Sequence, residues 1–70
     1  MKLYDVIESD QNNCITILAN SATEALITVA IKKRYDAKYV DHRQYINSVK
    51  RKIKQDKGYL KVYNFSVKTD

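Results

Sequence analysis

Two short runs near the start of the chain are rich in apolar and β-branched residues. They cover residues 3–8 and 14–19, and the polar segment between them, residues 9–13, contains Ser, Asp, Gln and Asn. Asp and Asn tolerate the backbone angles of tight turns, and β-branched runs bounded by such residues are typical of strands. The pattern predicts a β-hairpin, in which Cys14 is a small buried hydrophobic residue.

A helix is predicted to begin after this hairpin. Ser21-Ala22-Thr23-Glu24 fits a capping box, in which the Ser and Glu side chains accept backbone N–H groups of the first turn. Residues at spacings of three and four form one apolar face: Ala22, Ala25, Leu26, Val29 and Ala30. Ile27 and Ile31 lie on nearly the opposite side. We prefer a helix sandwiched between the sheet and a second helix, because buried helices are commonly apolar all round. The alternative is a homodimer contact through Ile27 and Ile31.

A second helix is predicted over residues 42–57. Its apolar stripe is out of register with the first helix and consists of Tyr45, Ile46, Val49 and Ile53. Asp41 is the predicted N-cap of this helix, because Asp41-His42-Arg43-Gln44 resembles a second capping box. Gly58, the only glycine, is expected at the C′ position, where a left-handed conformation ends the helix.

Residues 59–67 are predicted to form a third strand, because apolar and polar positions alternate over the first half of this segment. Alternation directs Leu60 and Val62 to one face. It directs another set to the opposite face: Tyr59, Lys61, Tyr63 and Phe65. The expected fold is therefore a single α+β domain over residues 1–70. Its order is ββααβ, with a three-stranded sheet and the two helices packed on one face.

The composition narrows the class of protein. With one cysteine the chain has no intramolecular disulfide, which favours a reducing cytosol, bacterial or that of a phage-infected host. No segment has the length or apolar character of a signal peptide or a membrane helix, so we expect no membrane association. Cys and His residues at metal-ligand spacing and cofactor-binding motifs are also missing from the sequence, and we expect neither metal nor cofactor.

Charge is strongly segregated along the chain. Residues 1–31 carry one lysine against four carboxylates, whereas residues 32–70 carry twelve Lys and Arg against four Asp, which gives local charges of −3 and +8. A basic half with few compensating carboxylates favours binding to a polyanion. The candidate binding residues are Arg43, Asn47, Lys50, Arg51, Lys54 and Lys57 on the second helix, and Tyr59, Lys61 and Tyr63 on the third strand.

The sequence therefore predicts a non-enzymatic accessory or regulatory protein that binds DNA or RNA through a basic helix. The alternative is a small phage-type accessory protein that binds and inhibits an acidic host protein or a nucleoprotein complex. Lys, Asn, Ile and Tyr fill 28 of the 70 positions, and their AT-rich codons favour an AT-rich bacterium, or one of its phages or plasmids, as the source. A small basic ribonuclease could use His42, Arg43, Tyr59 and Lys61, but no nucleophile or phosphate-loop motif accompanies them.

Overall fold

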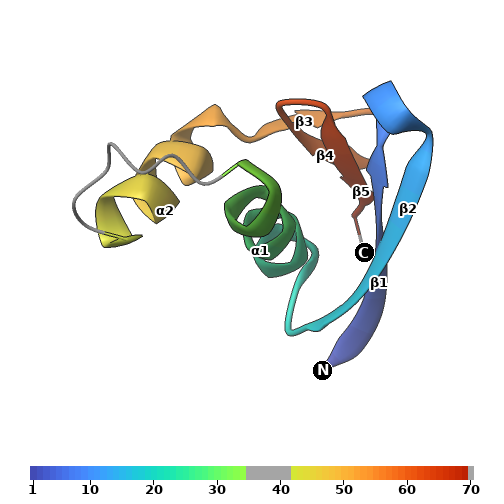
Figure 1. The fold of residues 1–70 in the computed structure, drawn as a ribbon. Coiled ribbons are helices and arrows are strands. Elements are labelled where there is room, and N and C mark those ends of the chain that lie inside the picture. The colour runs from blue at the N-terminus through green and yellow to red at the C-terminus, as the bar shows by residue number, and fades with distance from the viewer. Residues whose placement is uncertain (35–41, 70) are drawn as a thin grey trace.

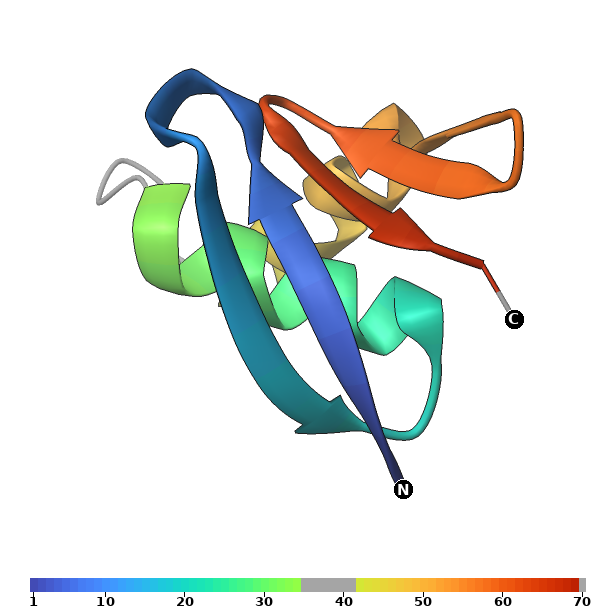
Figure 2. The same cartoon turned by 90° about the vertical axis from the view of Figure 1, so that its right-hand side faces the viewer.

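Five antiparallel strands form one sheet, and two helices lie on the same side of it (Figures 1 and 2). The computed structural model describes residues 1–34 and 42–69. The strand order across the sheet is β2-β1-β5-β4-β3, and β1 and β5 are therefore neighbours although they lie at opposite ends of the chain. The elements are β1 (Lys2–Glu8), the short 3-10 helix η1 (Ser9–Gln11), β2 (Asn13–Ala19), α1 (Ala22–Arg34), α2 (His42–Lys52), β3 (Lys54–Asp56), β4 (Tyr59–Val62) and β5 (Phe65–Lys68).

The predicted α+β class is confirmed, whereas the predicted number of strands and their order are wrong. The described elements follow the order ββααβββ and give a five-stranded sheet. The two additional strands come from residues 54–68, where the sequence suggested the end of a helix and one long strand. The errors in strand number and strand order both arise at two-residue turns, where one strand follows the next with only two residues between them.

The predicted β1–β2 hairpin is confirmed. Asn12 adopts a left-handed backbone with φ of 48°, and the strands pair from Glu8 opposite Asn13 to Lys2 opposite Ala19. The interpretation of Cys14 as a buried residue is wrong, because its side chain is exposed. Side chains alternate along a strand, and β2 turns its odd-numbered residues, such as buried Ala19, toward the helices.

The predicted capping of helix α1 is confirmed for Ser21, whereas Glu24 accepts from a different backbone N–H than predicted. The backbone N–H of Glu24 donates to Ser21 Oγ at 3.2 Å, and the backbone N–H of Asn20 donates to Glu24 Oε2 at 3.2 Å. The Glu24 carboxylate thus reaches one residue beyond the position of an ideal capping box. This bond fixes the corner between β2 and the helix.

The sandwiched placement of α1 is confirmed. One side of the helix packs on β1, β2, β4 and β5, and α2 packs against it as well. Leu26 and Val29 are buried in the main core, and Ile27 is only 8% exposed. Because a helix covered on two sides needs apolar residues all round, the two apolar faces of the sequence are accounted for. The homodimer contact through Ile27 and Ile31 stays a prediction.

Helix α2 begins at His42 as predicted but ends at Lys52, so the predicted extension to residue 57 is wrong. Its predicted N-cap, Asp41, lies outside the described residues. Tyr45 and Val49 are buried, which confirms the central part of the apolar stripe.

Gly58 has the expected positive φ, 83°, but it lies in the turn between β3 and β4 rather than at a helix end. Lys57 precedes it with φ of 50°, and two successive left-handed residues are typical of a type I′ hairpin turn.

The predicted third strand is divided into β4 and β5 by a turn at Tyr63 and Asn64. Leu60 and Val62 face the helices as expected, with Val62 buried. The prediction that Phe65 shares a face with Tyr59 and Lys61 is wrong, because Phe65 is fully buried in the core. The turn reverses the chain before Phe65 and thereby returns its side chain to the helix side of the sheet.

The core lies between the sheet and α1. Its largest fully buried side chains are Val6, Leu26, Val29, Val49, Phe65 and Val67. They come from β1, both helices and β5, so each of these elements loses packing if another is removed. Among the described residues, neither helix is long and apolar enough to cross a membrane.

One acidic side chain is buried within this apolar framework. Glu8, at the end of β1, is only 6% exposed, and Asn64 Nδ2 donates a long hydrogen bond of 3.4 Å to its Oε2 atom. Glu8 Oε1 and Asn64 Oδ1 have no hydrogen-bond partner among the described residues. Two buried acceptors without donors are unfavourable, more so when one belongs to a carboxylate.

We therefore expect Glu8→Gln to raise the free energy of unfolding at neutral pH by about 1 kcal/mol. The new amide removes the buried charge and can donate to Asn64 Oδ1. Urea unfolding measures the change, and Glu8→Ala serves as the control, because it removes the hydrogen-bond acceptor of Asn64 and should destabilise. A Glu8→Gln protein that is less stable than wild type would contradict this account.

Candidate nucleic-acid interface

The end of α2 and the β3–β4 hairpin bring cationic side chains of three elements together. Only Ile53 separates the last residue of α2 from β3, and Ile53 packs against the core. Strand β3 then pairs with β4, with Lys54 directly opposite Lys61. The cations of the last helical turn therefore lie beside those of the hairpin.

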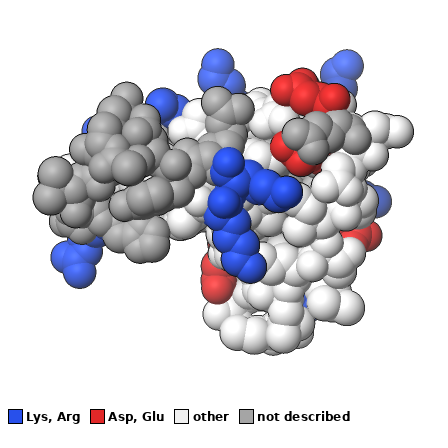
Figure 3. Space-filling view, viewed as in Figure 1, with Lys and Arg blue, Asp and Glu red and all other residues white. Residues whose placement is uncertain are grey.

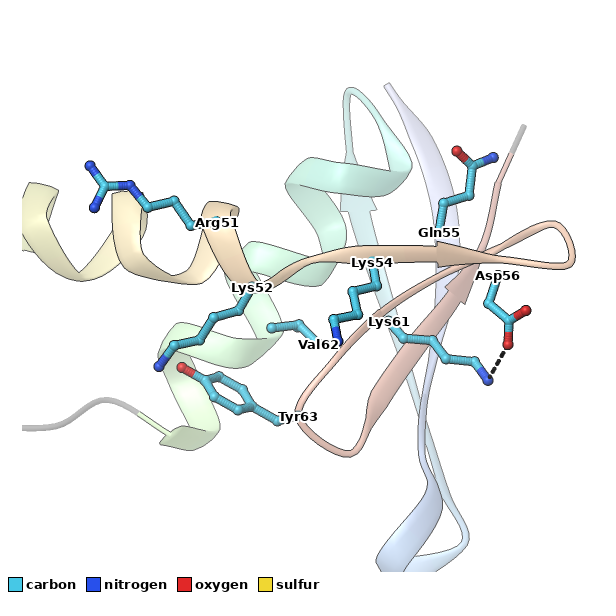
Figure 4. A pocket seen from close by; sticks show the side chains of 8 residues that line it. All are labelled: Arg51, Lys52, Lys54, Gln55, Asp56, Lys61, Val62 and Tyr63. Carbon is cyan, nitrogen blue, oxygen red and sulfur yellow. Dashed lines mark hydrogen bonds and ion pairs between the residues drawn. The ribbon is translucent and has the colours of Figure 1, made fainter.

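These side chains surround a cavity of about 730 Å³, which we call the basic pocket. It is lined by Arg51, Lys52, Lys54, Gln55, Asp56, Lys61, Val62 and Tyr63. Figure 4 shows the Lys52, Lys54 and Lys61 side chains on the same side of the hairpin as the Tyr63 ring, whereas Arg51 and Gln55 point away. Four cations thus line the basic pocket with one carboxylate, Asp56.

The pairing of Lys54 with Lys61 is unfavourable in the absence of a bound anion. Like charges directly opposite one another on antiparallel strands repel. Lys61 Nζ forms an ion pair with Asp56 Oδ2 at 3.4 Å, but both side chains are about half exposed, so the pair contributes little stability. Among the described residues, no carboxylate forms an ion pair with Lys54. An anion between the two lysines would relieve their repulsion.

Tyr63 supplies an aromatic surface beside these cations. Lys52 Nζ lies 5.5 Å from the centroid of the Tyr63 ring, within the range of a cation–π contact. Tyr63 is 40% exposed and has φ of 54°. A left-handed backbone is rare for a bulky residue and costs about 1–2 kcal/mol, whereas Gly or Asn would adopt it readily. The strained backbone makes Tyr63 a candidate for a role beyond the turn.

The structure separates the remaining predicted site residues from the basic pocket. Arg43 and Asn47 are exposed near the start and middle of α2, and Lys50 faces a groove between α1 and α2 instead. Lys57 lies in the hairpin turn, and Tyr59 is exposed on the side of the sheet that faces away from the helices. The predicted helical stripe therefore ends at Lys50, because Lys54 and Lys57 are not part of a helix.

Lys52 lines the basic pocket but was not among the predicted site residues. It belongs to the run Lys50-Arg51-Lys52, which is visible in the sequence as a cluster of charge. Its importance depends on its contact with Tyr63, which follows it by eleven positions. Only the hairpin between them brings the two side chains together.

Figure 3 shows how charge is distributed over one face of the molecule. Lys and Arg side chains gather over α1 in the middle of this view, whereas the lower end, near the start of β1, is mostly uncharged.

The residues proposed for a ribonuclease are not collected into one cluster, since Arg43 is at the start of α2 and Lys61 on β4. The side chain of His42 lies outside the described residues.

Comparisons with protein-family models, curated proteins and solved structures find no match for this chain. The functional argument therefore depends on the pocket itself.

Lys54→Glu should raise the free energy of unfolding by about 0.3–1 kcal/mol, because it replaces a repulsive cross-strand pair with an attractive one. The measurement is urea unfolding at low and high salt, since added salt should screen most of the gain. Lys2→Glu is a matched control, with the same change in net charge on an exposed strand residue opposite Ala19. Equal effects of the two substitutions would show that Lys54 and Lys61 do not interact.

Proposed function

We propose that this chain is a non-enzymatic, nucleic-acid-binding accessory or regulatory protein, and that the basic pocket holds the phosphate backbone. The observation that supports this most directly is the opposition of Lys54 and Lys61 beside Lys52. Repulsion between these lysines lowers the stability of the free protein and is relieved when a phosphate group binds among them.

The shape and composition of the site favour an extended polyanion over a small anion. The four cations that line the pocket come from the last turn of α2, from β3 and from β4, so they are spread over three elements. Neutralising successive phosphates releases counterions, and this gain grows with the number of phosphates contacted. Lysine presents a compact charge without a planar hydrogen-bonding pattern, so binding should depend little on base sequence.

Exposed tyrosines favour single-stranded over double-stranded nucleic acid. Tyr63 lies at the pocket and Tyr59 two positions from Lys61, and both residues are more than a third exposed. Unpaired bases can stack on such rings whatever their identity, whereas paired bases inside a duplex cannot.

Binding should be strongly salt-dependent. Contact with about four phosphates predicts a slope of log K against log salt of roughly −3 for a single strand and −3.5 for a duplex. Fluorescence anisotropy with labelled oligonucleotides of mixed sequence measures both slopes. If no DNA or RNA binds at low salt and high micromolar protein, the proposal fails, and an acidic host protein becomes the leading candidate partner.

Paired charge reversals locate the site in the same assay. Lys52→Glu with Lys54→Glu should weaken binding by about tenfold or more, because two phosphate contacts become repulsive. Lys2→Glu with Lys68→Glu is the matched control, since it changes the net charge equally at exposed positions outside the basic pocket. Equal losses in the two double variants would mean that net charge, and not the pocket, governs binding.

Tyr63→Asn should separate binding from stability. Asn accepts the left-handed backbone, and this relief should offset the lost packing to within about 1 kcal/mol in unfolding free energy. Affinity for single strands should fall by about tenfold through loss of stacking, with a smaller change for duplexes. Unchanged affinity for single strands would exclude Tyr63 as a stacking surface.

A further inference from the structure

Strand β2 forms an unprotected edge of the sheet. Within the described residues its only strand neighbour is β1, and its seven residues lie in a segment, 11–23, that has no charged residue, proline or glycine. The other edge, β3, has three residues, all exposed, two of them charged. Short and charged edges prevent unwanted strand pairing, so β3 is protected and β2 is open to another strand.

The hydrogen-bond pattern shows which backbone groups of β2 point outward. Ser9 N donates to Asn64 O at 2.9 Å, next to the register pair of Glu8 and Phe65. In an antiparallel ladder, hydrogen-bonded and non-hydrogen-bonded pairs alternate. Because Ser9 bonds Asn64, the next pair, Glu8 and Phe65, is not hydrogen-bonded, and the backbone N–H and C=O groups of Glu8 point toward β2 instead. Its partner there is Asn13. Bonding direction alternates along the strand, so the residues that point their N–H and C=O groups outward are Cys14, Thr16 and Leu18.

The side chains at this edge are apolar on both faces of the sheet. Leu18 is 55% exposed and Cys14 is exposed on the open face. Ile15 and Ile17 face the helices but are only partly buried, since α1 does not fully cover the outer strand. A further strand beside β2 would remove apolar surface from water on both faces.

We propose that β2 pairs antiparallel with β2 of a second copy of this chain, about a twofold axis at Thr16. This register pairs the whole strand with itself: Cys14 lies opposite Leu18 of the other copy, and Ile15 opposite Ile17. The outward groups of Cys14, Thr16 and Leu18 then all find partners, because these three positions are symmetric about the axis. The sheets of the two copies become continuous.

Charge favours a second copy as the occupant. The strand order places β2 at the edge farthest from β3, which belongs to the basic pocket. Residues 11–23, which include β2, carry no charged side chain. Pairing through β2 therefore joins two basic proteins at uncharged edges and keeps their basic pockets at opposite ends, where mutual repulsion is weakest.

Thr16→Pro tests the pairing, with molar mass measured by sedimentation equilibrium. The Thr16 N–H points away from β1, so proline in both copies removes the two bonds of the central Thr16 pair and leaves the β1–β2 ladder intact. We expect twice the protomer mass for wild type at high micromolar concentration and the protomer mass for Thr16→Pro. Thr16→Val is the matched control: it also loses the 2.7 Å bond from Thr16 Oγ1 to Asp5 Oδ1 but keeps the N–H, and should stay dimeric.

Disulfide trapping tests the register without relying on the proline variant. Residues opposite each other in a hydrogen-bonded pair have Cα atoms about 5.5 Å apart, within the range of a disulfide. Leu18→Cys should therefore form a covalent dimer with Cys14 of the other copy under oxidising conditions. Leu3→Cys, on the neighbouring strand opposite Leu18 and 71% exposed, is the control and should form far less.

Three results would overturn the proposal. A monomeric wild-type protein would show that β2 is open to a strand of some other protein or to none. A wild-type dimer with equal cross-linking of Leu18→Cys and Leu3→Cys would place the contact elsewhere, as would a Thr16→Pro protein that remains dimeric.

Discussion

Burial of α1 between the sheet and α2 is the constraint on which the rest of the structure depends. This helix packs on four strands and on α2, and it contributes Leu26 and Val29 to the fully buried core. A sheet of this size needs one covered face, and α1 provides most of that cover. Helix α2 has its main described contacts with α1, through residues such as Tyr45 and Val49 that are themselves buried. The position of the last turn of α2, and of the basic pocket beside it, therefore follows from the packing of α1.

The strand order converts the charge segregation of the sequence into a separation in space. The first half of the chain forms β1, β2 and α1, and the second half forms α2 and the β3–β4 hairpin. Strand β5 lies between the two groups and joins β1 to β4. Because β2 and β3 occupy opposite edges, the basic pocket lies at the edge away from β2, although Lys32 and Lys33 of the basic half belong to the end of α1. The protein thus presents one basic end and one uncharged edge, and these are the two surfaces for which we propose partners.

Local signals in the sequence predicted those elements whose stability is mainly local. The capping residues Ser21 and Glu24 fixed the start of α1, and the polar segment 9–13 fixed the first hairpin. Residues 53–58 could not be predicted in this way. Ile53 continues the helical stripe of Val49 at a spacing of four, and nothing in Lys54-Gln55-Asp56 opposes a helix. Pairing with β4 decides the conformation, as tertiary contacts commonly override propensity.

The same limitation affected the site. Lysines 54 and 61 were predicted as binding residues on separate elements, but their direct opposition depends on the Lys57–Gly58 turn. A Lys-Gly pair is a weaker hairpin signal than Asn-Gly or Asp-Gly, so no local pattern predicted that the two lysines lie opposite each other. The contact between Lys52 and Tyr63 could not be predicted either, because it requires the β3–β4 hairpin that lies between them.

Dimerisation through β2 would change the affinity of the protein for nucleic acid. In the proposed dimer the two basic pockets lie at the far ends of one continuous sheet, because each β3 is the edge opposite its own β2. A short oligonucleotide reaches one pocket only, whereas a longer strand that spans the sheet can occupy both. The second contact is then intramolecular, and its effective concentration depends on the length and stiffness of the nucleic acid between the pockets. Weak, sequence-independent contacts at each pocket would therefore add up to a preference for long strands, without any increase in the charge of either site.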